Sequence, residues 1–422
     1  MARTIEMKNI LIIYPHWHPV NLAGVHRPRL IGNFLTDFDW HPVILTVKEE
    51  FFEEKPDYDF EKTFRDHYEV HRVNAFRIGK IRLFGDIGIR AFYQLYIKAI
   101  KIINSKKIDF IWIPVPSYYP ALLGRLLYKK FRIPYGIDYI DPWVRDMSNY
   151  PNYGIRQRLS LTIAKFLEPI AVKNVALISG VAKSYYQSVL DRNNGNNTML
   201  DCAMPYGFDP MDNNIELPVE TPWADINIRP FIYAGAFMPN ASSFFYKLFG
   251  QIKELQNANL WDNNIRLYFI GTGMYPGKTI KEIALECNIG DTVVENRERY
   301  PFLHILHFLN KAEGVMAIGS PSAHYTASKI FQSVLSRKPV FAYFHSDSTV
   351  VQILKEAKAD AFLMMYSANE SELDSKVRLN QILQSYFALN KLWSPDFQAL
   401  NKYSARTSAA VLVSAINKCI ER

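Results

Sequence analysis

Short apolar runs alternate with longer amphipathic stretches along the first half of the chain. Five runs have the length and continuous apolar character of strands buried on both faces. They are residues 9–14, 41–47, 110–115, 135–140 and 174–179. Apolar positions at helical spacing fill the intervals between these strands. The helices predicted there are 24–36, 87–105, 118–131 and 155–172. Strands that alternate with helices pair in parallel, so this half predicts a doubly wound α/β domain.

The same alternation restarts near residue 230. The strands predicted in this half are 230–234, 265–270, 292–295, 314–318 and 339–343. The helices are 241–256, 277–287, 300–311 and 328–336, and a last helix covers 403–421. Segment 193–226 is rich in Asn, Pro and Asp, which is typical of a linker. We therefore expect two α/β domains facing a central cleft, where ligands meet the carboxyl ends of the strands. The boundaries are 1–208 for the first domain, 209–228 for the linker, 229–395 for the second domain and 396–422 for the terminal helix.

Composition narrows the class of protein. Of the 422 residues, 49% are hydrophobic and 21% charged, which indicates a folded globular chain. Its three cysteines are far apart in the sequence, which argues against disulfides and zinc and suggests a reducing compartment such as the cytoplasm. The net charge of +8 favours anionic partners such as nucleotide phosphates or anionic lipid. The basic residues are dispersed and no nucleic-acid motif is present, so we expect no nucleic acid partner.

The segment at 320–343 carries the most informative chemistry. A strand ends at Gly319, a small polar loop follows, and a helix begins near Ser328 with Lys329 in its first turn. Free backbone N–H groups and the helix dipole make such a start suitable for an anion, and Lys329 adds a positive charge. The alternative is a loop capped by Ser328 with a solvated lysine.

This segment resembles the donor-binding element of the family 4 glycosyltransferases, which are retaining enzymes of the GT-B fold. That family has two glutamates eight residues apart, followed by an apolar run that ends in G-K-P-V. Here the run ends in R-K-P-V at 337–340, and His324 and Gln332 stand at the glutamate positions. Further segments resemble the family in the same order along the chain. They are D-Y-I-D-P-W at 138–143, P-Y-G-F-D at 205–209, Y-A-G at 233–235 and I-G-T-G at 270–273.

The resemblance implies two Rossmann-like doubly wound domains of the GT-B type and a donor site on the second domain. Gln332 would bind the ribose hydroxyls, His324 the donor sugar and Lys329 the diphosphate, while Arg297 would contact the base or a phosphate, or stay a solvated charge. Gly235 would let the backbone approach a phosphate. The donor-binding residues are then Gly235, Phe237, Gly271, Arg297, Tyr325, Ser328, Lys329 and Gln332, with His324 and Lys329 also acting in catalysis.

The first domain would bind the acceptor. Candidate contacts follow its predicted strands: His16, His18, Gly24, Arg27 and Tyr118. Asp141 could orient or deprotonate the acceptor hydroxyl, although it could equally cap the turn before Pro142. Tyr118 could stack on a sugar ring or pack in the core.

We expect neither a metal nor a cofactor. His16 and His18 have no third ligand nearby. Of the two Asp-x-Asp pairs, Asp37 and Asp39 precede a predicted strand, where a metal-binding pair would follow one, and the other pair lies in a charged loop. The glycines at 271 and 273 lack the third glycine of a dinucleotide fingerprint.

The sequence thus predicts a metal-independent, retaining hexosyltransferase. Its substrate would be a nucleotide-diphosphate sugar, and its acceptor a glycan or lipid-linked sugar of surface polysaccharide biosynthesis. Two alternatives remain open: a non-catalytic relative that binds nucleotide sugar or glycan in an assembly complex, and a nucleotide-sugar epimerase. Segment 89–107 joins aromatic and basic residues, which suits either contact with an anionic membrane at the cytoplasmic face or packing on the domain's own sheet.

Overall fold

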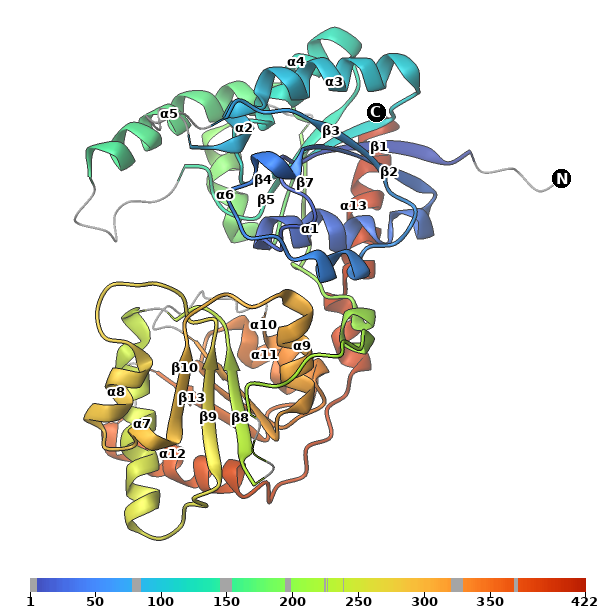
Figure 1. Ribbon diagram of the computed structural model, residues 1–422. Coiled ribbons are helices and arrows are strands. Elements are labelled where there is room, and N and C mark those ends of the chain that lie inside the picture. Colours follow the sequence, from blue (N-terminus) through green and yellow to red (C-terminus); the bar gives the residue numbers. More distant parts are fainter. Residues whose placement is uncertain are drawn as a thin grey trace, which may run out of the picture. The chain divides into compact units, whose positions relative to one another are not determined.

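The computed structural model divides the chain into two compact units. One comprises Met1–Asp209 and Tyr403–Arg422, and the other comprises Pro210–Lys402. The structure describes residues 6–77, 85–144, 154–193, 199–223, 225, 227–237, 239–319, 329–367 and 371–422. Figure 1 shows that each unit is a twisted sheet with helices on both of its faces.

The first unit contains a parallel sheet of seven strands in the order β3-β2-β1-β4-β5-β6-β7. The strands are β1 (Lys8–Ile13), β2 (Trp40–Val47), β3 (Glu69–Val73), β4 (Phe110–Val115), β5 (Tyr135–Tyr139), β6 (Leu177–Gly180) and β7 (Leu200–Ala203). Ile10 of β1 lies opposite Pro42 of β2 on one side and Phe110 of β4 on the other. The chain therefore runs outward in both directions from β1 and β4, which makes their boundary the switch point of the sheet.

Helices cover both faces of this sheet. They are α1 (Ala23–Gly32), α2 (Ile87–Arg90), α3 (Phe92–Ser105), α4 (Ala121–Phe131), α5 (Ile155–Val172), α6 (Lys183–Arg192) and α13 (Ala405–Ile420). Short 3-10 turns lie at Leu35–Phe38, Glu49–Phe51 and Tyr58–Thr63. The terminal helix α13 packs against α1, β6 and β7, so it is part of the first unit. All six residues of β4 are buried, as its uninterrupted apolar sequence predicts.

The second unit contains a parallel sheet of six strands in the order β10-β9-β8-β11-β12-β13. The strands are β8 (Arg229–Ala234), β9 (Ile265–Ile270), β10 (Val293–Asn296), β11 (Gly314–Ile318), β12 (Val340–His345) and β13 (Phe362–Tyr366). The helices are α7 (Ser242–Asn257), α8 (Ile280–Glu286), α9 (Phe302–Lys311), α10 (Lys329–Leu335), α11 (Thr349–Glu356) and α12 (Glu372–Phe387). The 3-10 turns are Pro210–Asn214, Pro239–Ala241, Gly290–Thr292 and Gln398–Tyr403. The switch point of this sheet lies between β8 and β11.

The predicted fold class is confirmed: both units are doubly wound parallel α/β structures. The sequence missed several elements. These are β3, β7, β13, α6, α11 and α12. Strands β3, β7 and β13 form edges of their sheets, where burial is incomplete. Charged residues interrupt the apolar sequences of β3 and β7, whereas the sequence of β13 is continuously apolar and was nevertheless missed. Strand β7 lies inside the segment that was interpreted as a linker. Within the described residues, no helix combines the length and apolar content that crossing a bilayer requires.

Candidate functional site

The switch point of the second sheet brings Gly235 and Lys329 into contact. Gly235 follows β8, and Lys329 begins α10, the helix that comes after β11. A Cβ atom built on Gly235 would lie only 1.6 Å from Lys329 Nζ. The ammonium therefore rests directly against the backbone of Gly235. This is where doubly wound sheets bind their ligands, at the carboxyl ends of the two strands that flank the reversal.

Lys329 carries a positive charge that the described residues around it do not compensate. Crowding of the ammonium by protein atoms, and secondly the charge of Arg299, lower its pKa to about 8. The residue as a whole stays exposed, so it is the ammonium end that the protein shields from water. No carboxylate within the described structure forms an ion pair with Lys329. An anion at this position would find two cations and would restore the pKa of Lys329.

Gln332 lies one helical turn after Lys329, on the same side of α10. It is half-buried, and its side-chain amide makes no hydrogen bond among the residues that the structure describes. Both a donor and an acceptor are thus available beside the ammonium.

The loop after β9 is held in place by two charged residues. Arg297 Nε donates to the carbonyl oxygen of Gly273 at 2.9 Å, and its guanidinium lies 4.6 Å from the ring centroid of Tyr275. A carboxylate oxygen of Glu295 accepts hydrogen bonds from the hydroxyls of Thr272 and Tyr275, at 2.6 and 3.0 Å. The structure therefore gives Arg297 a role in shaping the loop. Glu295 was not among the residues expected from the sequence, although a carboxylate at the end of a predicted strand is a signal for it.

Of the other predicted donor residues, the structure describes Gly271 and Phe237. Gly271 has a φ of +70°, which favours glycine, and its N–H donates to the carbonyl oxygen of Asn296. Phe237 is buried in the aromatic core of the second unit. His324, Tyr325 and Ser328 lie outside the described residues, as does the predicted start of the helix at Ser328.

The switch point of the first sheet brings together Tyr14, directly after β1, and Gly24, in the first turn of α1. A Cβ atom on Gly24 would lie 1.8 Å from the hydroxyl oxygen of Tyr14 and 3.6 Å from the carbonyl oxygen of Pro116, which follows β4. Tyr14 was not among the residues expected from the sequence, in which the first candidate acceptor contacts, His16 and His18, lie in the loop that follows it.

Acidic side chains surround the Tyr14 hydroxyl. Burial raises the pKa of Tyr14 far above its usual value, and the neighbouring Tyr206 hydroxyl and the carboxylates of Asp86, Glu54 and Asp141 add to this effect. The hydroxyl thus stays protonated. Asp141 is exposed at the end of β5, and Asp86 is a further carboxylate at the same end of the sheet. The structure therefore brings the predicted Asp141 into one neighbourhood with Tyr14.

Arg27 does not face a ligand. Its guanidinium is fully buried and pairs with the carboxylate of Asp138, with Nε–Oδ2 and Nη2–Oδ1 distances of 2.9 and 3.1 Å. It also donates to the carbonyl oxygen of Pro205 at 2.6 Å, and the hydroxyl of Ser179 donates to Asp138 at 2.7 Å. These contacts give Arg27 a structural role in the core, beneath the strand ends, in place of the acceptor contact that the sequence suggested.

The two loop histidines have different partners. His16 Nε2 lies 3.7 Å from a carboxylate oxygen of Glu54, and His18 Nε2 lies 3.2 Å from a guanidinium nitrogen of Arg72. Burial lowers the pKa of both imidazoles. Nowhere in the described ranges do three or more His, Cys, Asp or Glu side chains gather as metal ligands.

Tyr118, after β4, faces the protein. Its ring stacks on that of Trp143 at 5.6 Å with an interplanar angle of 8°, and its hydroxyl donates to the carbonyl oxygen of Pro142 at 3.0 Å. Tyr118 therefore supports the segment that carries Asp141.

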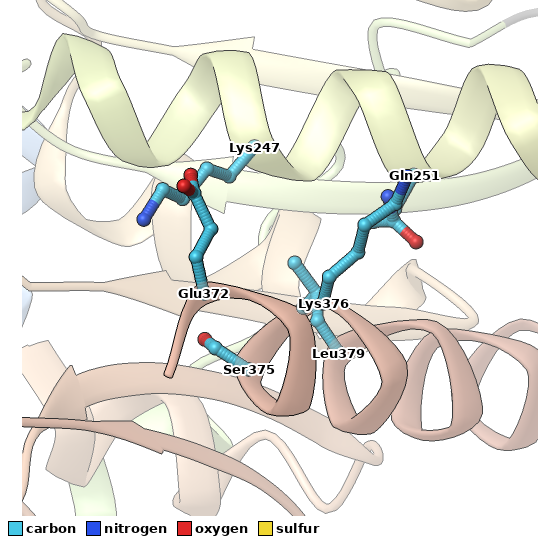
Figure 2. Close-up of a pocket in the computed structure, with 6 residues that line it drawn as sticks. All are labelled: Lys247, Gln251, Glu372, Ser375, Lys376 and Leu379. Atoms are coloured by element: carbon cyan, nitrogen blue, oxygen red, sulfur yellow. The ribbon is translucent and has the colours of Figure 1, made fainter. Parts of the chain in front are cut away.

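A shallow groove on the second unit lies apart from these strand ends. Figure 2 shows side chains from α7 and α12 that project into the space between the two helices. They are Lys247 and Gln251 on α7, and Glu372, Ser375, Lys376 and Leu379 on α12. None of them belongs to the predicted site, and the groove runs beside the middle of α7.

Comparisons with known proteins rest on structure, since no protein-family model and no curated protein matches the sequence. HepE of Anabaena, solved in complex with UDP, superposes with a TM-score of 0.59 at 12% identity over 98% of this chain and 100% of that chain. Sucrose-phosphate synthase of Thermosynechococcus elongatus gives 0.53 at 14% identity, covering 98% and 95%. UDP-GlcNAc 2-epimerase of Methanocaldococcus jannaschii gives 0.51 at 12% identity, covering 97% and 100%. The chain therefore has the two-domain, Rossmann-like GT-B fold that glycosyltransferases share with UDP-sugar epimerases.

Proposed function

We propose that this protein is a glycosyltransferase that transfers a sugar from a nucleotide-diphosphate sugar to a glycan or lipid-linked acceptor. The observation that carries the proposal is the contact of the Lys329 ammonium with Gly235 at the switch point of the second sheet. We further propose that the reaction needs no metal, retains the configuration of a hexosyl donor and serves surface polysaccharide biosynthesis.

The charge on Lys329 fits the chemistry of this reaction. Negative charge develops on the leaving diphosphate as the bond to the sugar breaks, so a cation placed there stabilises the transition state. The ammonium needs no rearrangement of ion pairs before it meets the phosphate, because no carboxylate of the described structure holds it. The charge of Arg299 adds to that of Lys329. The lack of a side chain on Gly235 lets a phosphate approach both the ammonium and the backbone.

The nucleotide and the sugar are assigned to neighbouring residues. Gln332 would hydrogen-bond the ribose hydroxyls, because its amide lies one turn from Lys329 and has no hydrogen bond to any described residue. His324 would contact the donor sugar, as the family resemblance implies. Uridine diphosphate is the first nucleotide to test, because HepE binds UDP and shares the fold.

We assign the acceptor to the first unit. Asp141 is an exposed carboxylate at the end of β5, so it can accept a proton from an acceptor hydroxyl or orient it. Tyr14 stays protonated beside it and can donate a hydrogen bond. The lack of a side chain on Gly24 makes room for the Tyr14 hydroxyl itself.

Calorimetric titration with UDP and GDP tests the binding step. Lys329→Met keeps the length of the side chain and removes its charge, so diphosphate affinity should fall about tenfold to a hundredfold. A matched control is Lys247→Met in the groove of Figure 2, which should bind like the wild type.

Incubation with a panel of nucleotide sugars tests the reaction. Release of nucleotide only when a glycan or lipid-linked acceptor is present supports the proposal. Release without an acceptor, together with an epimerised sugar, would show an epimerase. Tight binding without release across the acceptor panel would show a non-catalytic protein. Either result contradicts a transferase.

A further inference from the structure

Helix α5 exposes a stripe of large apolar side chains. Ile155, Leu159, Ile163 and Phe166 are 86%, 60%, 37% and 70% exposed. Their spacing of four, four and three residues places them on one side of the helix. A single exposed apolar residue is ordinary, whereas four in a row along one helix form a continuous patch.

The opposite side of α5 is fixed to the first unit. Ala164, Glu168 and Ala171 are buried there, and α5 packs against α4. The carboxylate of Glu168 accepts hydrogen bonds from the guanidinium of Arg192 at 2.7 to 3.0 Å. The helix therefore cannot turn its exposed stripe inward without breaking a buried ion pair. In Figure 1 the first turns of α5 extend past the neighbouring helices of the first unit.

Basic side chains border the stripe. Helical geometry places Arg156 along one edge and Arg158 and Lys165 along the other, and all three are exposed. The only acidic residue of α5 is Glu168, which is buried against Arg192. The outer surface of α5 thus combines an apolar centre with two positive edges and no negative charge.

We propose that α5 is a docking surface for an anionic phospholipid bilayer. Ile155, Leu159, Ile163 and Phe166 would enter the boundary between headgroups and acyl chains, and the basic edges would meet the lipid phosphates. Charge complementarity favours an anionic bilayer over other partners. A helix that lies in the plane of the membrane–water interface needs an apolar face bordered by basic residues. The proposal does not depend on sugar transfer, since vesicle binding is measured without nucleotide.

This surface differs from segment 89–107, for which the sequence left membrane contact and packing on the sheet as alternatives. In α3, within the segment 89–107, Leu95, Ala99 and Ile102 are buried and pack within the first unit. Tyr93 is exposed at 65% but has no exposed apolar neighbour one turn further along α3. The proposed membrane contact is therefore α5 and not α3.

Co-sedimentation of the full-length protein with lipid vesicles tests the proposal. The wild type should bind phosphatidylcholine vesicles that contain phosphatidylglycerol, bind pure phosphatidylcholine about tenfold less well, and lose the difference at high salt. The double variant Leu159→Ser/Phe166→Ser should reduce binding about tenfold or more, because each side chain contributes apolar burial. Arg158→Gln/Lys165→Gln should remove the preference for phosphatidylglycerol.

Helix α12 offers a matched control. Leu373 and Val377 are also exposed and four residues apart, at 71% and 49%, so Leu373→Ser/Val377→Ser removes comparable apolar surface. This variant should bind vesicles like the wild type, and equal melting temperatures should show that both double variants fold. The proposal is overturned if the two variants bind vesicles equally. It is also overturned if the wild type binds no vesicle and the α5 variant instead abolishes self-association in sedimentation velocity, which would make the stripe a contact between two copies.

Discussion

The ammonium of Lys329 occupies the space that a side chain on Gly235 would need. Three atoms of the lysine, Nζ, Cε and Cδ, lie within 1.6 to 2.9 Å of a Cβ atom built on Gly235. The two residues are distant in sequence, and they meet because β8 and β11 are neighbours in the sheet. Donor binding as proposed depends on this contact.

Gly235→Ala should displace the lysine. The added methyl group would force the ammonium away, and the φ of +142° would strain any residue with a Cβ by about 1–3 kcal/mol. We expect affinity for UDP to fall at least about tenfold and the melting temperature to fall slightly. Gly250→Ala is the control. A Cβ atom at this position would meet nothing within 4 Å, and the substitution replaces a glycine inside helix α7. It should stabilise the protein by about 0.5–1 kcal/mol and leave UDP binding intact. If Gly235→Ala bound UDP with wild-type affinity, the contact between Gly235 and Lys329 would not be needed for diphosphate binding.

The affinity for UDP should depend on pH near 8. The pKa of Lys329 is lowered to about 8, so the ammonium predominates below that pH and the neutral amine above it. Only the ammonium attracts a diphosphate, so affinity should fall as pH rises through 8. Bound diphosphate raises the pKa of Lys329, so binding near pH 8 should take up protons. Calorimetry in two buffers of different ionisation enthalpy measures this uptake.

Lys329→Arg should abolish that pH dependence, because a guanidinium stays protonated throughout the range. An affinity that stays flat for the wild type from about pH 7 to about pH 9.5 would mean that Lys329 does not meet the phosphates.

Arg27 and Asp138 should behave as a structural pair. Both side chains are fully buried, so removing one leaves an unpaired buried charge. Arg27→Met should lower the free energy of unfolding by about 3–5 kcal/mol in urea titrations. The double variant Arg27→Met/Asp138→Leu should recover part of that loss, because neither buried charge remains. The assignment is contradicted if Arg27→Met is as stable as the wild type and has lost only acceptor binding. Arg27 would then contact the acceptor.

The close approach of Tyr14 to Gly24 gives a second packing test. Gly24→Ala should cost about 1–3 kcal/mol, because its Cβ would lie 1.8 Å from the Tyr14 hydroxyl oxygen. Adding Tyr14→Phe removes that oxygen but leaves the ring carbon at 2.9 Å, so rescue should be partial. Unfolding of the two single variants and the double variant in urea gives the coupling energy. Strict additivity of the two changes would argue against the contact.

Much of the fold was predictable because buried parallel strands have continuous apolar sequences. The run at 110–115 predicted β4 without error. The edge strand β7 was missed, because its four residues alternate between exposed and half-buried positions and include Asp201. The helical pattern at 155–172 predicted α5 but not which of its apolar residues are exposed, because that depends on contacts from α4.

The candidate site was predictable only in part. The motif identified Lys329 and Gly235, but their contact depends on strand order, which periodicity does not specify. Arg27 was assigned to the acceptor because it follows the first predicted strand, where the family resemblance places acceptor contacts. A signal against this was available: Asp138 interrupts the buried run at 135–140, and a buried carboxylate needs a cationic partner.

A crystal structure of the protein with UDP is the most direct test. The account predicts a diphosphate oxygen within about 3 Å of Lys329 Nζ, beside the backbone of Gly235. The proposed site is contradicted if the diphosphate binds elsewhere in the protein while Lys329 contacts Gly235 and no phosphate.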